Sequence, residues 1–175
     1  MPDRDIAEVV KIEYQVKDRW SERNSTVVEH IPAGSSILDL GCGDKDILNY
    51  VECSDYWGVD LCEYADQIHD FDDELLTWDR KWDIGLLLGV IYYPHHTDRF
   101  LSHYKQFADK WIVVINPKTI LLKDQWNHCF NEDTMPPVLL RHFSKVSSRI
   151  DIPTTIPKLG RSHETKTFQM WVCEV

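Results

Sequence analysis

Short apolar runs alternate with polar segments along most of the chain, and this alternation predicts the order of its strands and helices. Five apolar runs have the length of buried strands: Ser36–Leu40, Tyr56–Leu61, Gln67–His69, Asp83–Val90 and Trp111–Ile115. The remaining periodicity predicts helices over 5–20, 22–30, 98–108 and 132–141, with Thr97 as the N-cap of the third. Alternating strands and helices indicate an α/β protein, with a parallel sheet that carries helices on both faces.

The end of the chain has a different pattern. Two longer stretches of strand-forming residues, Lys145–Ile152 and Lys166–Glu174, follow one another without a helix between them. Pro153, Pro157 and Gly160 lie between the two stretches and favour a turn. We therefore expect an antiparallel C-terminal strand pair that completes the sheet.

Length, charge and cysteine usage limit the class of protein. A chain of 175 residues fits one domain, with predicted helices within 1–32 and alternating strands and helices over 33–175. The net charge of −10 argues against a nucleic-acid surface. Five scattered cysteines without a Cys-x-x-Cys pair suggest neither zinc nor disulfides. No apolar run is long enough to span a membrane and there is no leader, and the unpaired cysteines fit a reducing cytoplasm, so we expect a cytoplasmic protein. We expect a monomer or a homodimer.

The first predicted strand ends in a glycine-rich turn that suits a nucleoside. Gly41 and Gly43 follow Asp39 directly, and glycine allows both unusual backbone angles and a close approach of a ligand. The next strand ends in Asp60, at the spacing found in nucleoside-binding βαβ units. Its carboxylate is expected to accept hydrogen bonds from both ribose hydroxyls.

The residues after the glycines argue against a dinucleotide. A pyrophosphate-binding fingerprint has a third glycine at the position that Asp46 occupies, at the start of a helix. Asp44 adds a second carboxylate there, and the two would repel phosphate groups. A nucleoside ligand with a sulfonium and an amino acid tail would tolerate them.

These residues resemble class I S-adenosylmethionine-dependent methyltransferases, whose first motif is similar to Leu38-Asp39-Leu40-Gly41-Cys42-Gly43. The apolar run from Trp82 to Ile91 is similar to their fourth strand. The resemblance implies a Rossmann-like core over 33–175 with a seven-stranded sheet, and helices over 1–32 that cover the active site. It implies S-adenosylmethionine as cofactor and S-adenosylhomocysteine as its product. It also implies that Asp70 receives the adenine amino group and Phe71 contacts the ring. The full cofactor set is Asp39, Gly41, Cys42, Gly43, Asp60, Leu61, Asp70, Phe71, Gly89 and Val90.

Weaker similarities extend over nearly the whole chain. Small methyltransferases often carry a Trp-x-x-Arg start and an Asn-His pair before a late helix, which resemble Trp20-Ser21-Glu22-Arg23 and Asn127-His128. Tyr92 departs from this pattern, because an acid is common at its position. Any role that depends on an acid there is therefore in doubt.

The methyl acceptor should lie beyond the carboxyl ends of the strands. Histidine suits the removal of a proton from an oxygen or nitrogen nucleophile, because its ordinary pKa is about 6.5. His128 is the first candidate, with Asn127 to hold the acceptor, and His95 is the second. We expect methyl transfer to a small polar molecule, with no metal and neither a nucleic acid nor a membrane as partner. A binding subunit without turnover, or other chemistry on the same cofactor, remains an alternative.

Overall fold

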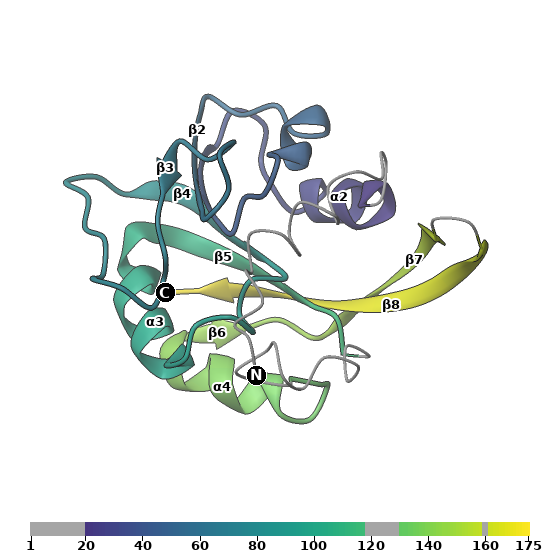
Figure 1. Cartoon of the computed structure of the whole chain (residues 1–175). Coiled ribbons are helices and arrows are strands. Elements are labelled where there is room, and N and C mark those ends of the chain that lie inside the picture. The colour runs from purple at the N-terminus through teal and green to yellow at the C-terminus, as the bar shows by residue number, and fades with distance from the viewer. Residues whose placement is uncertain (1–19, 118–129, 159–160) are drawn as a thin grey trace, which may run out of the picture.

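The computed structural model describes residues 20–117, 130–158 and 161–175, which form a mixed sheet with helices on both faces (Figure 1). The predicted helix over 5–20 therefore lies outside the described residues, apart from Trp20. None of the described helices is long and apolar enough to cross a bilayer.

The strands run in the order β3-β2-β1-β4-β5-β8-β6, and β7 also pairs with β8. The first five strands are parallel, and β8 is antiparallel to β5. The sequence placed the five parallel strands to within a few residues. Their bounds are β1 Ser36–Leu40, β2 Asp55–Asp60, β3 Gln67–Ile68, β4 Trp82–Leu88 and β5 Ala108–Ile115, and those of the last three are β6 Lys145–Val146, β7 Ile150–Lys158 and β8 Arg161–Glu174.

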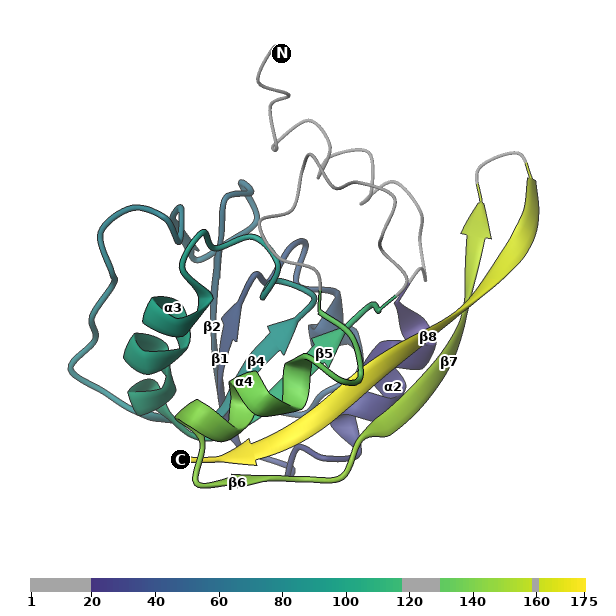
Figure 2. The ribbon, with the colours of Figure 1, turned by 90° about the horizontal axis from the view of Figure 1, so that it is seen from below.

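Two apolar layers bury the two faces of the sheet. Helices α3 (Thr97–Tyr104) and α4 (Met135–His142), with the 3-10 turn η2 (Lys105–Phe107), pack on the face that carries Leu38 and Leu40. Helix α2 (Ser21–Val28) packs on the other face, over Ile37 (Figure 2). The helices on both faces are thus confirmed, although α3 starts one residue early: His96, not Thr97, is its N-cap.

The sheet has eight strands where seven were predicted, because the sixth is broken. Val146 pairs with Cys173 and Ile150 with Met170. Moving from the first pair to the second therefore takes four residues on the β6–β7 side but only three on β8. The extra residue makes a bulge that separates β6 from β7. The predicted turn between the two C-terminal strands was too wide: Pro153 and Pro157 lie within β7, where an edge strand tolerates proline. β7 and β8 are joined between Lys158 and Arg161, and Gly160 lies outside the described residues.

No α-helix follows the glycine turn, against the expectation from the sequence. The chain forms a single 3-10 turn instead, η1 (Asp46–Asn49). Lys45 precedes it with a left-handed backbone (φ 61°), and β2 already begins at Asp55. The connection therefore has room for only a short turn.

Candidate functional site

The topology brings the predicted cofactor residues to one edge, because β1 lies between β2 and β4 and all three run parallel. Gly41 directly follows β1 with a φ of 80°. A Cβ atom there would lie 2.5 Å from the Cβ of Val90, in the loop after β4. Two residues predicted for the cofactor therefore pack on each other, and the fold itself requires glycine at position 41.

Asp60 is held beside the glycine turn by backbone donors. The N–H of Gly43 donates to its Oδ2 at 2.9 Å, and the N–H of Cys62 donates to its Oδ1 at 3.2 Å. The Cys62 thiol in turn donates to the Gly43 carbonyl at 3.0 Å. Leu61, which lies between Asp60 and Cys62 in the sequence, exposes 40% of its surface. The carboxylate at the end of β2 is thereby fixed in direct contact with the turn after β1.

Asp39 is a buried carboxyl group with one oxygen unsatisfied. The hydroxyl of Tyr56 donates to its Oδ2 at 2.7 Å, while its Oδ1 has no hydrogen-bond partner among the described residues. Burial raises the pKa of Asp39 to about 7, against the opposing effects of the Tyr56 hydrogen bond and the charge of Arg23. A cation or a hydrogen-bond donor beside Oδ1 would relieve this cost.

Helix α2 brings a buried guanidinium to the same edge. Arg23 donates to the carbonyl oxygen of Leu88, at the end of β4, at 3.2 Å, and to Oδ1 of Asn24 at 3.0 and 2.9 Å. Asn24 then donates to Asp46 at 2.8 Å, so the helix is tied to the turn that follows the glycines. The Trp-x-x-Arg resemblance singled out Arg23, whereas nothing in the sequence marked Asn24.

The contacts of the other predicted cofactor residues do not by themselves indicate a ligand. Asp70 accepts a hydrogen bond from the N–H of Asp72 at 2.9 Å. The ring of Phe71 packs edge to face on Phe100 and Tyr104 beneath α3, and Cys42 is buried. Among the described residues, no atom lies within 4 Å of the place that a Cβ of Gly89 would take. The roles of these residues stay predictions.

On the acceptor side, the structure describes one of the predicted catalytic residues. The His95 imidazole pairs through Nδ1 with Asp72, whose carboxylate also accepts the N–H of His95 at 2.7 Å. The side chain of His95 is 67% exposed. Sequence analysis missed Asp72, because nothing in a run of acidic residues marks which one faces a distant histidine. Asn127 and His128 lie outside the described residues.

Tyr92, the departure from the family pattern, links two strand ends. Its side chain is buried, and its hydroxyl accepts the backbone N–H of Asn116 in a short hydrogen bond. The loop after β4 is thus attached to the loop after β5. This contact gives the buried tyrosine a structural role between the two loops.

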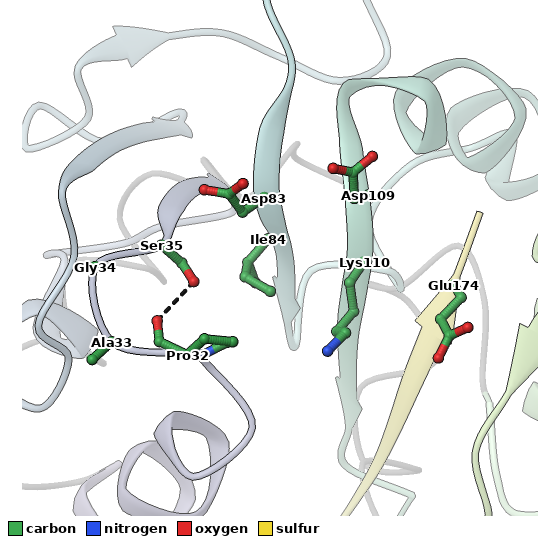
Figure 3. A pocket seen from close by; sticks show the side chains of 9 residues that line it. All are labelled: Pro32, Ala33, Gly34, Ser35, Asp83, Ile84, Asp109, Lys110 and Glu174. Atoms are coloured by element: carbon green, nitrogen blue, oxygen red, sulfur yellow. Dashed lines mark hydrogen bonds between the residues drawn. The ribbon is translucent and has the colours of Figure 1, made fainter.

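A separate hollow of about 440 Å³ lies at the opposite end of the sheet (Figure 3). It is an open depression at the amino ends of β1, β4 and β5, lined among others by Gly34, Asp83 and Lys110. The Asp83 carboxylate is already engaged by the N–H and hydroxyl of Ser36, each at 2.7 Å. Because parallel α/β sheets bind ligands at the carboxyl ends of their strands, we do not assign the site here.

Comparison with solved structures defines the fold. A chain of the complex between the Haloferax volcanii Trm112 methyltransferase activator and a methyltransferase superposes with a TM-score of 0.75 at 13% identity, covering 95% of this chain and 94% of that one. The N-methyltransferase NodS from Bradyrhizobium japonicum WM9, in complex with S-adenosylhomocysteine, gives 0.68 at 13%, covering 97% and 99%. The Burkholderia thailandensis 1,6-didemethyltoxoflavin-N1-methyltransferase, also with S-adenosylhomocysteine, gives 0.70 at 15%, covering 97% and 85%.

Sequence comparison adds less. The family model described as CO dehydrogenase beta subunit/acetyl-CoA synthase epsilon subunit matches residues 51–120, which is under half of the chain and leaves out the glycine turn. No curated protein matches. The solved structures reported above are nevertheless all of methyltransferases. The chain has the fold of the class I S-adenosylmethionine-dependent methyltransferases.

Proposed function

We propose that this protein binds S-adenosylmethionine and transfers its methyl group to an oxygen or nitrogen of a small polar molecule. The observation that carries the proposal is the 2.9 Å hydrogen bond between the Gly43 N–H and Asp60, in a methyltransferase fold. This bond holds an acidic acceptor beside a glycine turn at the carboxyl edge of the sheet. A ribose with two adjacent hydroxyls fits such an acceptor.

The charges at this edge also fit that cofactor. Asp39, with its unsatisfied Oδ1, suits the cofactor's ammonium group, while Asp44 and Asp46 favour a cationic ligand over an anionic one. When bound, the cofactor supplies a methyl group that is already activated for transfer. The protein therefore has mainly to align the acceptor with it.

His95 and His128 are the proposed proton acceptors for a nucleophile that must lose a proton. Asp72 holds the Nδ1 side of His95, which favours the tautomer that accepts a proton at Nε2. Asn127 is proposed to orient the acceptor. The small-molecule acceptor of the toxoflavin enzyme supports this class of substrate, whereas the protein activator in another neighbour belongs to that complex.

Calorimetry tests the cofactor step. Asp60→Ala should weaken binding of S-adenosylhomocysteine by at least about tenfold, since each hydrogen bond to a charged acceptor is worth about 1.5–3 kcal/mol. Asp55→Ala is the matched control, because Asp55 lies at the other end of the same strand and pairs with Arg80 at 2.6 Å. Equal affinities in the two variants would reject the assignment.

Turnover is tested with methyl-labelled cofactor and a panel of sugars, amines and phenols. Label in an acceptor supports methyl transfer. Cofactor binding without consumption indicates a subunit that has lost turnover, and consumption without a labelled acceptor indicates other chemistry on the sulfonium. Product analysis by mass spectrometry separates these three outcomes.

A further inference from the structure

The β2–β3 end of the sheet is less covered than the rest. Parallel strands are normally buried on both faces. Between β1 and β4 the chain forms only η1 and no α-helix, so the connections that usually cover β2 and β3 supply no helical layer. Every residue of β4 except one is buried, whereas β2 has two buried residues of six and β3 has none.

Apolar side chains are exposed at this end. Trp57, Tyr64 and Ile68 expose 36%, 54% and 63% of their surfaces, and we call them the β3 edge. The pairing register puts Trp57 on the face of α3 and Ile68 on the opposite face. Of the large apolar side chains exposed among the described residues, most fall between Leu48 and Ile68. Such clustering marks an interaction site more often than scattered exposure does.

β3 is a short edge strand of two residues. Among the residues that the structure describes, no strand pairs with its outer side (Figure 1). Edge strands are commonly protected by lysine or proline, and neither occurs between Asp60 and Asp70. Its outer backbone groups can therefore pair with another strand.

The charge of this region restricts the partner. Residues 46–79 contain eleven acidic residues and no Lys or Arg. A second copy would bring two such segments together, and like charges would oppose that pairing. A nucleic acid would be repelled for the same reason. A basic polypeptide would be attracted and correctly oriented.

We propose that the β3 edge docks an extended, Lys- or Arg-bearing segment of another protein, which adds to β3 as a further strand. Its backbone pairs with β3, its apolar side chains contact Ile68 on one face of the sheet, and its basic side chains, on the other face, are attracted by the acidic segment. This surface does not depend on the cofactor.

The experiment is a titration of the full-length, ¹⁵N-labelled protein followed by NMR. The probe is an acetylated octapeptide of alternating Lys and Val. Two matched peptides have Glu in place of Lys, or N-methyl groups on alternate residues that prevent strand pairing. The basic peptide should shift the amide signals of residues 57–69, and its affinity should fall as salt is added. The two matched peptides should leave these signals in place.

Two variants locate the surface. Ile68→Asn should weaken binding of the basic peptide by about tenfold. Leu140→Asn is the control. Leu140 is 61% exposed on α4, and α4 contacts β6, which lies at the opposite end of the strand order from β3. Both variants should bind S-adenosylhomocysteine like the parent protein, which also verifies folding. The proposal is overturned if the basic peptide does not bind, if a matched peptide binds equally well, if both variants lose the peptide alike, or if sedimentation shows that the edge pairs two copies.

Discussion

Gly34 and Gly41 share one backbone conformation but have different surroundings, which allows a test at the scale of single residues. Their φ angles are 77° and 80°. A Cβ at Gly34 would meet no atom of the described part of the chain within 4 Å, whereas one at Gly41 would meet the side chain of Val90. Gly34→Ala should lower the free energy of unfolding by about 1–2 kcal/mol through backbone strain alone. Gly41→Ala should lose about 1–3 kcal/mol more, through overpacking.

Urea unfolding of both variants measures this difference. An equal loss would mean that Val90 moves aside without cost, and that the packing between the two strand ends is loose. Two reasons for glycine at 41 were predicted, an unusual backbone angle and the approach of a ligand. The φ of 80° agrees with the first, and the first neighbour that a larger side chain would meet is Val90.

Asp39 should make stability depend on pH. Its pKa is raised from 3.8 to about 7 in the folded protein, chiefly by burial. Between these values the folded protein keeps a proton that the unfolded chain has released, so the free energy of unfolding falls as the pH rises through this window and is level above it. Asp39→Asn should remove a slope of roughly 1.4 kcal/mol for each pH unit.

The measurement is urea unfolding at several pH values between about 4 and 8, with Asp55→Asn as a control for an exposed aspartate. The control should retain the slope of the parent protein. If Asp39→Asn retains it as well, then Asp39 does not hold the proton. Cofactor binding gives a second readout: a cation beside Oδ1 should be bound more tightly as Asp39 loses its proton above the same pH.

The pairing of Asp60 with the glycine turn could be predicted from the sequence, because strand ends and spacing are visible there. The partners of the buried groups could not. Tyr56 meets Asp39 because their strands are adjacent, and Asp72 meets His95 through two loops. Hydrogen bonds between residues distant in sequence leave no periodic signal.

At the scale of elements, the turn after β1 decides which nucleotides the site should reject. Without a helix at this position there is no helix dipole to attract a phosphate, and η1 has only four residues. Asp44 and Asp46 add negative charge. NAD and ATP at millimolar concentration should therefore fail to displace S-adenosylhomocysteine.

Adenosine is the matched competitor for this prediction, since it has the same ring and ribose as ATP without the phosphates. It should displace the cofactor weakly but measurably in a calorimetric competition. If ATP competes as well as adenosine does, the carboxylates do not control selectivity and the turn accepts phosphate.

The broken sixth strand shows a limit of periodicity. Val146 and Ile150 would share a face in a regular strand, but Val146 packs on the layer of α3 and α4, and Ile150 on that of α2. The bulge between them changes the face. Because both faces of the sheet are covered by apolar layers, an apolar residue fits either one, and the sequence pattern cannot reveal the change.

At the scale of the whole molecule, the sequence predicted the class of fold and the helices on both faces, but not which strands the helices cover. The motifs of β1, β2 and β4 specify the order of strands, whereas the coverage of β2 and β3 depends on how short the connections are. The net charge of −10 was likewise used only as a total. Its concentration between residues 46 and 79 became meaningful when the structure placed that stretch at an uncovered edge.

The last prediction concerns turnover, a property of the whole enzyme that has to be separated from folding. If His128 accepts the proton, His128→Ala should lower turnover by about 10²–10⁴-fold and leave cofactor affinity and melting temperature unchanged. If His95 is the base instead, His95→Ala should cause this loss of turnover. Asp72→Asn should then lower turnover as well, because Asp72 pairs with the His95 ring. His30→Ala, at the end of α2, is the control for loss of a histidine. Folded fraction and rate are measured together on each variant. A lower melting temperature with an unchanged rate per folded molecule would make the histidine structural, and full activity in both His128→Ala and His95→Ala would show that transfer depends on alignment alone.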